Sequence, residues 1–338
     1  MAIIDGLGRK LNYLRVSVTD RCNLRCRYCM PFGGVAPIEH KEILSFEEIL
    51  RVVSIMADLG VNKVRLTGGE PLVRKGIATL AKRIKEIRGI EILGLTTNGV
   101  LLGDMAKELS DSGVDAINIS IDTTDEMRYK NLTLFDMYNE VRRGLLAALE
   151  NSFNSVKVNC VLSPFSIPDD WIHVAAFAKD NAIDVRFIEW MPMAGEEMIE
   201  QNIIYRMDTV KGVLGKEFGE MTPCSNEENV AACAKMFSVH GFIGRLGFIP
   251  AMSSPFCKSC NRLRLTSTGD LRLCLFYDKG LALKSLLRGG ASDEYIAKQI
   301  LKTVEGKPAG HIGHRVNFGE NSDTEAISSI CGMSQVGG

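Results

Sequence analysis

A regular alternation of short β-rich segments with amphipathic helical segments is the feature that most constrains the fold. The expected strands are "LRVSV" (14–18), "KVRLT" (63–67), "EILGLT" (91–96), "AINISI" (116–121), "VKVNCV" (156–161) and "DVRFIEW" (184–190). The expected helices lie at 45–60, 76–89, 102–112, 136–150 and 168–180, and the first opens with Ser45 and Glu48 in capping-box spacing. Strands separated by helices form a parallel sheet with right-handed crossovers, either open and doubly wound or curled into a partial barrel. Both arrangements bind ligands at the carboxyl ends of the strands.

Length and composition indicate how the chain is divided and which binding partners are unfavourable. The alternation fails after residue 222, where Pro, Ser and Gly become frequent, so we predict an α/β domain over 1–222 and a C-terminal region over 223–338. A formal net charge of −1 argues against binding nucleic acid or a membrane surface, and no apolar run approaches the ~20 residues of a membrane span. The N-terminus lacks a signal-peptide core, so we expect a cytoplasmic protein.

Six of the ten cysteines form two groups of three, which in an intracellular enzyme favours metal binding over disulfides. The first group, Cys22, Cys26 and Cys29, directly follows the first strand. Thiolates are the usual ligands of iron–sulfur clusters, and three of them leave one iron of a cubane cluster open for a cofactor or substrate. The alternative is a zinc site completed elsewhere, for which His40 is the nearest histidine. The scattered cysteines are interpreted as small apolar residues: Cys160, Cys224, Cys233 and Cys331.

Several segments at the carboxyl ends of later strands support a site in this place. The glycines of "TGGEP" (67–71) allow a ligand to come close to the backbone. Glu70 of the same segment can accept a hydrogen bond from an ammonium group. "TTNG" (96–99), Ser120 and "EWMPM" (189–193) end the third, fourth and sixth strands. Each motif alone is an ordinary turn signal, and their joint placement is what indicates a site.

Basic residues interrupt strands that should otherwise be apolar. Arg15, Arg65, Lys157 and Arg186 lie on four different strands. Unpaired buried charges are costly, so they need anionic partners. Acidic residues such as Asp20 or Glu189 are one alternative, but four cations converging on one cavity favour a polyanion such as a triphosphate.

The second cysteine group lies on an expected hairpin. "RLRLT" and "DLRLC" alternate with period two around "STG", with Gly269 left-handed in the loop. Pairing Thr266 with Asp270 returns Cys274 to the vicinity of Cys260 and Cys257, on the face that carries Arg262 and Arg264. This favours a second open cluster beside an anionic substrate. The alternative is a zinc ribbon completed by His240, His311 or His314.

Both motifs resemble a known family. "CNLRCRYC" after a first strand is similar to the signature of radical S-adenosylmethionine enzymes, and its combination with "FCKSCNRLRLTSTGDLRLCLF" and a terminal Gly337-Gly338 resembles the GTP 3′,8-cyclase family. The resemblance implies a partial (β/α)6 TIM-like barrel with a C-terminal iron–sulfur cluster region. It implies two 4Fe-4S clusters, on Cys22, Cys26 and Cys29 and on Cys257, Cys260 and Cys274. It implies S-adenosylmethionine contacts at Tyr28, Gly69, Ser120 and Met191, and the place of Glu70 in "TGGEP" adds that residue. It implies GTP contacts at Arg15, Arg65, Thr96, Lys157, Arg262 and Arg264, and the place of Arg186 among the strand cations adds that residue.

The implied activity is radical cyclisation of GTP to (8S)-3′,8-cyclo-7,8-dihydroguanosine 5′-triphosphate, the first step of molybdenum cofactor biosynthesis. No side chain is assigned a catalytic role, because cluster and cofactor generate the radical. The implied partners are GTP, an external electron donor and a downstream molybdopterin-precursor enzyme, in a monomer or homodimer. Segment 229–240 departs from the family pattern and is assigned no role. Two alternatives stay open: a radical peptide-modifying enzyme with an auxiliary cluster, and a zinc-dependent nucleic-acid-binding protein.

Overall fold

The computed structural model describes residues 2–30, 36, 38–191, 206–224, 233–277 and 279–310. Its strands are β1 (Tyr13–Ser17), β2 (Lys63–Thr67), β3 (Ile92–Thr97), β4 (Ala116–Ser120), β5 (Ser155–Leu162), β6 (Asp184–Glu189), β7 (Met221–Pro223), β8 (Lys235–Val239), β9 (Arg245–Ile249), β10 (Arg262–Leu265), β11 (Asp270–Arg272) and β12 (Gly280–Ala282). Its helices are α1 (Phe46–Asp58), α2 (Ile77–Lys85), α3 (Leu102–Asp111), α4 (Glu126–Thr133), α5 (Tyr138–Glu150), α6 (Pro168–Asp180), α7 (Met207–Phe218), α8 (Leu283–Arg288) and α9 (Asp293–Val304).

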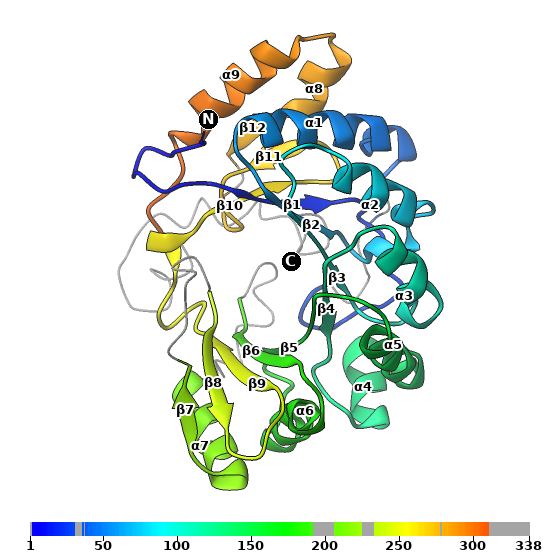
Figure 1. Ribbon diagram of the computed structural model, residues 1–338, viewed down its shortest axis with the longest axis vertical. Helices are drawn as coiled ribbons and strands as arrows, with labels where there is room; N and C mark the ends of the chain where they lie inside the picture. Colours follow the sequence, from blue (N-terminus) through cyan, green and yellow to red (C-terminus); the bar gives the residue numbers. More distant parts are fainter. Residues whose placement is uncertain are drawn as a thin grey trace.

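The described strands form one sheet that curves into an open arc. Its order is β12-β11-β10-β1-β2-β3-β4-β5-β6-β9-β8-β7, and β1 to β6 are parallel neighbours in chain order. Figure 1 shows α1, α2, α3, α5 and α6 around the outer side of this arc. The predicted α/β fold, a partial barrel of six strand–helix units, is therefore confirmed.

Local sequence explains why the helices begin where they do. The Ser45 hydroxyl accepts from the backbone N–H of Glu48, whose side chain accepts from the N–H of Ser45, so the predicted capping box at the start of α1 is confirmed. Helix α4 was not predicted, because few of its side chains are buried and its apolar periodicity is weak. None of the helices in the described ranges combines the length and hydropathy that crossing a membrane requires.

The two faces of the barrel strands differ in polarity. The outward side chains, such as Leu14, Val64 and Ile117, are buried in the core beneath the helices. The inward positions alternate with them and are largely polar or charged, as at Arg15, Arg65 and neighbouring positions of β4 and β5. The fold therefore builds a polar lumen inside an apolar wall.

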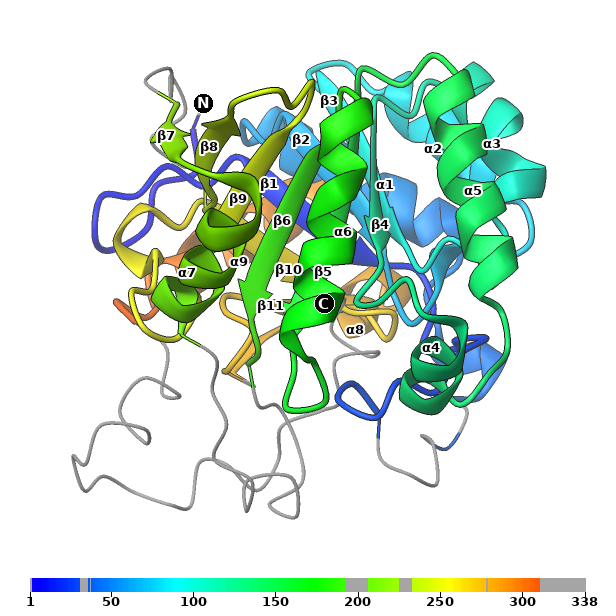
Figure 2. The ribbon, with the colours of Figure 1, turned by 90° about the horizontal axis from the view of Figure 1, so that it is seen from below.

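The C-terminal strands extend this same sheet at both ends. Strand β9 is parallel to β6, and β10 is parallel to β1. Figure 2 shows α6 along strands β5 and β6, with α7 beside β8 and β9. The predicted boundary at residue 222 falls within β7, and strands on both sides of it share one sheet. The division into two domains therefore stays a prediction.

Candidate active site

The first cysteine group lies in the loop that follows β1. The backbone N–H groups of Arg25 and Arg27 donate to the carbonyls of Thr133 and Leu132, so the end of α4 holds this loop in place. The N–H of Cys29 donates to the carbonyl of Cys26 in a tight turn. All three predicted cysteines therefore belong to one short, anchored segment.

The three thiols of this loop are partly buried and influence one another's ionisation. Each is free of disulfides and partly buried. Burial, together with the nearby Cys22 and Asp122, raises the pKa of Cys29 to about 12. Burial likewise raises the pKa of Cys26, and Cys29 adds to the shift. These thiols are close enough for their charges to oppose one another, which an iron–sulfur cluster between them would relieve.

The two glycines of "TGGEP" serve close backbone packing at this loop. A Cβ on Gly69 would lie 2.3 Å from the carbonyl oxygen of Arg21, and one on Gly68 would lie 2.6 Å from that of Thr19. The close approach is thus to the segment that leads into Cys22. The prediction that Gly69 also contacts a cofactor stays a prediction.

Glu70 is fully buried and hydrogen-bonded within the protein. Its Oε1 accepts from Leu72 N at 3.0 Å and from Thr97 Oγ1 at 2.7 Å, while Oε2 accepts from Asn98 N at 2.7 Å. The carboxylate therefore joins the turn after β2 to the turn after β3. Asn98 in turn approaches Cys22, with Nδ2 3.8 Å from Sγ. Glu70 supports the cysteine loop through this chain, and its predicted contact with a cofactor stays a prediction.

Burial of Glu70 predicts a pH-dependent stability. Burial raises its pKa from 4.5 to about 7, although three hydrogen bonds oppose the shift. The pKa of Glu70 is higher in the folded than in the unfolded protein. Its contribution to the free energy of unfolding is therefore complete below about pH 4.5 and is lost as pH rises through about 7. In cluster-free protein, the unfolding free energy of wild type relative to Glu70→Gln should fall over this window by on the order of 3 kcal/mol. Denaturant titrations across the window measure it, with Glu86→Gln at an exposed carboxyl as control; parallel curves would contradict the expectation.

Tyr28 lies beside the cysteine loop and contacts the end of β4. Its hydroxyl donates to Asp122 Oδ2 at 2.6 Å, and Asp122 Oδ1 accepts from Val161 N at 2.7 Å. Burial raises the pKa of Asp122 to about 6. Ser120, two residues earlier, ends β4 at the same edge. The structure thus brings Tyr28 and Ser120 to the carboxyl ends of the strands, the edge at which the cysteine loop begins.

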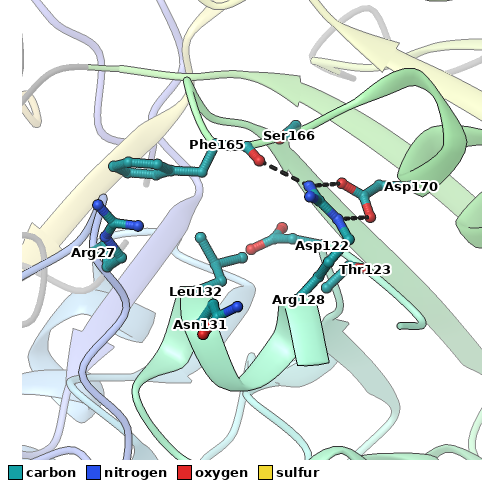
Figure 3. Close-up of a pocket in the computed structure, with 9 residues that line it drawn as sticks. All are labelled: Arg27, Asp122, Thr123, Arg128, Asn131, Leu132, Phe165, Ser166 and Asp170. Atoms are coloured by element: carbon teal, nitrogen blue, oxygen red, sulfur yellow. Dashed lines mark hydrogen bonds and ion pairs between the residues drawn. The ribbon is translucent and has the colours of Figure 1, made fainter. Parts of the chain in front are cut away.

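A pocket of about 250 Å³ opens at this edge (Figure 3). Arg128 crosses its wall, donating to Asp170 from both Nε and Nη2 and to the carbonyl of Phe165. Arg27 lies over the Phe165 ring at 4.1 Å. The full lining is Arg27, Asp122, Thr123, Arg128, Asn131, Leu132, Phe165, Ser166 and Asp170.

The predicted basic residues do converge inside the barrel. Arg15 pairs in register with Arg65 on one side and with Arg264 on the other. Burial, together with the nearby Arg262 and Arg65, lowers the pKa of Arg15 to about 10. Burial also lowers the pKa of Arg264 to about 9, with Arg15 and Arg262 contributing. Guanidinium groups that lower one another's pKa in this way form a strongly positive region inside the barrel, which favours an anion.

Arg65 is held by a phenol and a backbone carbonyl. Its Nε donates to the Tyr13 hydroxyl at 2.8 Å and its Nη1 donates to the carbonyl of Leu95 at 2.9 Å. A Cβ on Gly94 would lie 2.5 Å from Nη2, so glycine on β3 makes room for the guanidinium. Burial opposes ionisation of Tyr13, but the surrounding cations, led by Arg65, outweigh it and lower the pKa of Tyr13 to about 7.

The other two predicted strand cations differ in their partners. Lys157 forms an ion pair with Asp184 at 2.9 Å, and Asp184 also accepts from Arg245. Arg186 donates from Nε and Nη2 to the amide oxygen of Asn159. The charge of Lys157 is thus balanced by a carboxylate, whereas Arg186 is hydrogen-bonded to an uncharged amide.

The acidic residues first considered as partners bind elsewhere. Asp20 Oδ2 accepts from Ile38 N, and Glu189 accepts from Met252 N and from the backbone and hydroxyl of Ser253. Glu189 therefore ties the end of β6 to the segment after β9. The interpretation that Asp20 or Glu189 neutralises the strand cations finds no support among these hydrogen bonds.

Two polar side chains in the lumen lack a partner within the described ranges. Thr96 Oγ1 and Asn118 Oδ1 are buried without a hydrogen bond, and the two residues are register partners on β3 and β4. Lys157 is the next partner of Asn118 along the sheet. Orphaned buried polar atoms beside a cation are expected where a polar ligand binds.

Sequence reasoning missed several lumen residues that the structure brings into the site. Tyr13, Lys63, Asn118, Asn159 and Asp184 each lie two positions from a predicted site residue on the same strand. Applying period-two alternation to every position of each strand, and not to the basic ones alone, would have found them.

The second cysteine group lies on the predicted hairpin. Arg264 pairs with Arg272, Thr266 N donates to the carbonyl of Asp270, and Gly269 has φ of 88°, so the predicted hairpin register and left-handed loop residue are confirmed. Cys257, Cys260 and Cys274 form no disulfide and are partly buried. In the ranges described above, no three His, Cys, Asp or Glu side chains gather as ligands of a single ion.

The two cysteine groups lie at opposite ends of the barrel. Strands β1 and β10 are parallel, with Tyr13 paired to Arg262. Cys22 follows the carboxyl end of β1, whereas Cys260 precedes the amino end of β10. The basic lumen lies between them.

Some predicted features fall outside the described residues. These are Pro192 and Met193 of "EWMPM", positions 229–232, His311, His314, Cys331 and the Gly337-Gly338 tail. Met191 is described, half-buried, and packs against Met252 and Ile249. Its predicted contact with a cofactor stays a prediction.

Comparisons with known proteins agree with this geometry. Residues 16–178 match the Radical SAM superfamily, and residues 183–312 match Molybdenum Cofactor Synthesis C. The chain is 41% identical to the GTP 3′,8-cyclase of Thermodesulfovibrio yellowstonii, over 92% of this chain and 96% of that protein. It is 37% identical to human molybdenum cofactor biosynthesis protein 1, over 92% of this chain and 48% of that protein. In fold it is similar to Streptococcus suis SuiB bound to S-adenosylmethionine, with a TM-score of 0.58 and 15% identity over 88% of this chain and 68% of that one.

Proposed function

This chain belongs to the GTP 3′,8-cyclase family of radical S-adenosylmethionine enzymes, and on that premise we propose which residues bind the clusters, the cofactor and the nucleotide. The enzyme acts on GTP in the first step of molybdenum cofactor biosynthesis, with a 4Fe-4S cluster and S-adenosylmethionine. The observation that carries the residue assignment is the basic lumen enclosed between two groups of three thiols.

Cys22, Cys26 and Cys29 hold the first cluster in this proposal. When bound there, the cluster and S-adenosylmethionine would supply the radical chemistry that acts on the ribose of GTP. We assign the orientation of the cofactor to Tyr28, Ser120 and Gly69. The Tyr28–Asp122 hydrogen bond, the end of β4 and the turn after β2 support this assignment, because they lie at the strand ends that the thiol loop also follows. Met191 and Glu70 complete the proposed set.

The lumen binds the triphosphate and the base. Arginine donates two parallel hydrogen bonds to phosphate oxygens. The register of Arg15 with Arg65 and the hydrogen bonds of Arg65 to Tyr13 and of Arg186 to Asn159 support a role for these three in binding the triphosphate. Lys157 joins them as a point charge, with Asp184 limiting its motion. Thr96 offers an unsatisfied hydroxyl to the same ligand.

A second 4Fe-4S cluster on Cys257, Cys260 and Cys274 is proposed at the other end of the lumen. Arg262 and Arg264 lie on β10, the strand that follows Cys260. They are the register partners of Tyr13 and Arg15 on β1. The protein's part in the reaction is therefore to hold a nucleotide between two metal sites and to exclude water from its reacting carbon atoms.

The proposal extends to partners. An external electron donor must reduce the first cluster, and a downstream enzyme must take the cyclic product in the pathway to molybdopterin. We place this activity in the cytoplasm, where a GTP pool is available to a chain of this kind.

GTP-dependent cofactor cleavage tests the assignment. Anaerobically reconstituted protein with dithionite and S-adenosylmethionine should form 5′-deoxyadenosine when GTP is present and little when it is absent. Cleavage indifferent to GTP would retain the superfamily and contradict the lumen as a nucleotide site. An ATP control separates recognition of guanine from recognition of the triphosphate alone.

A further inference from the structure

Two buried cations lie behind the second cysteine group, and the function as proposed makes no use of them. Lys307 follows α9 and is 5% exposed. The Arg9 side chain is 8% exposed and comes from the N-terminal segment. Figure 1 shows both segments, dark blue and orange, next to the start of β10. Buried lysine and arginine require partners that compensate the loss of hydration.

Lys307 bridges the two strands that lead to Cys260 and Cys274. Its Nζ donates to the carbonyl of Arg262 at 2.9 Å and to the carbonyl of Leu273. The backbone pairing of β10 with β11 includes Leu265 with Leu271 and Arg264 with Arg272. The ammonium group therefore joins the strands just beyond this ladder, on the side where the cysteines lie.

Arg9 fixes the remaining cysteine segment to the same place. Its Nη1 donates to the carbonyl of Cys257 at 2.8 Å, and its Nη2 donates to the carbonyls of Pro308 at 2.9 Å and Lys307 at 3.2 Å. Asp5 holds Arg9 through Nε at 2.6 Å. Arg9 and Lys307 thus connect all three cysteine-bearing segments through backbone carbonyls.

The charges in this network suit an anionic metal site. The carboxylate of Asp5 is used by Arg9 and by the backbone N–H of Leu7. The acceptors of Lys307 Nζ are both neutral carbonyls. A buried cation with neutral acceptors is stabilised by nearby negative charge, and three thiolates on an iron–sulfur cluster supply it.

We propose that Lys307 is a positioning residue of the second cysteine group, which sets the spacing of Cys260 and Cys274 and places a positive charge beside their metal site; the second part rests on the proposed second cluster. Arg9 fixes Cys257 in the same arrangement. Loss of Lys307 should loosen the second group and leave the first group, at the other end of the barrel, unchanged. Loss of its charge should lower the reduction potential of the second cluster.

Thiol alkylation in cluster-free full-length protein tests the positioning directly. Peptide mass spectrometry gives the rate at which iodoacetamide modifies each cysteine. Lys307→Met should accelerate modification of Cys260 and Cys274 by about tenfold, because each lost charged hydrogen bond changes a local opening equilibrium by roughly that factor or more. Lys307→Arg, which keeps charge and donors, should return the rates toward wild type. Lys302→Met, at an exposed lysine on α9, is the matched control.

Equal rates for Cys260 and Cys274 in wild type and Lys307→Met would overturn the positioning role. Should all six grouped cysteines accelerate alike, the variant has unfolded, and Arg9→Lys replaces it. Selective acceleration of Cys257 in Arg9→Lys then supports the network, and unchanged rates overturn it.

A second measurement addresses the metal site. In a background with Cys22, Cys26 and Cys29 replaced by alanine, iron content and the midpoint potential report on the second group alone. Lower iron and a more negative potential in Lys307→Met support the proposal, and an unchanged potential overturns the role of its charge. Absence of iron in the background protein itself would refute the second cluster, and the alkylation rates would still decide the positioning role.

Discussion

The Cys22→Ala variant is expected to form no 5′-deoxyadenosine above the level of an enzyme-free control. Three thiols in one loop are the smallest set that holds a cubane cluster with one open iron, so loss of one removes the place where the cofactor binds. Cys22 also contacts the backbone N–H of Leu24 and lies near Asn98, which links it to the turn after β3. Anaerobic turnover with dithionite, S-adenosylmethionine and GTP, followed by chromatography of the nucleosides, measures the loss.

Cys224→Ala is the matched control. Cys224 is a free, half-buried thiol that follows β7 and belongs to neither cysteine group. It should retain iron and activity. Normal cofactor cleavage in Cys22→Ala, at normal first-cluster iron, would contradict the assignment of this loop as the cluster site.

Arg65→Lys is expected to raise the KM for GTP by about 10- to 100-fold, because hydrogen bonds to a charged group contribute about 1.5–3 kcal/mol. The substitution keeps a positive charge and removes the planar fork that pairs with phosphate. It also removes the Nε donor to Tyr13 and the Nη1 donor to Leu95, so the remaining ammonium is poorly oriented. Initial rates of 5′-deoxyadenosine formation over a range of GTP concentrations measure the effect.

The control for Arg65 is an arginine of the same type on the surface. Arg83 pairs with Glu47 at 3.2 Å and both are exposed, so Arg83→Lys should leave KM unchanged. An Arg65→Lys enzyme with wild-type KM would show that the triphosphate lies elsewhere. A fall in kcat alone would place Arg65 near the reacting atoms and away from the phosphates.

The barrel strands, most of their helices and the hairpin could be predicted from the sequence, because each follows from the spacing of apolar residues along a short segment. The segment 63–67 is strand β2 as predicted, and the other five predicted strands differ from the structure by about one residue at an end. The hairpin register also follows from the sequence, because Gly269 permits the left-handed loop that pairs Thr266 with Asp270. These features depend on neighbours in sequence, which a single chain displays.

Side-chain contacts between residues that are far apart in the chain could not be predicted from the sequence. That Asp184 neutralises Lys157, or that Asn159 accepts from Arg186, depends on how β5 and β6 are aligned in the sheet. The packing of Gly69 against Arg21 depends on the path of two loops. Lys307 lies more than thirty residues from either strand that it joins, and no local pattern distinguishes it from the exposed lysines of α9.

The parallel pairing of β1 with β10 has a consequence for substrate length. A strand of five residues such as β1 spans about 17 Å at ~3.3 Å per residue, and the two cysteine groups lie beyond its opposite ends. The length of the barrel wall therefore sets the distance between the two cysteine groups. A molecule that contacts both ends at once must therefore span about the length of β1, and a shorter molecule must leave one end without contacts.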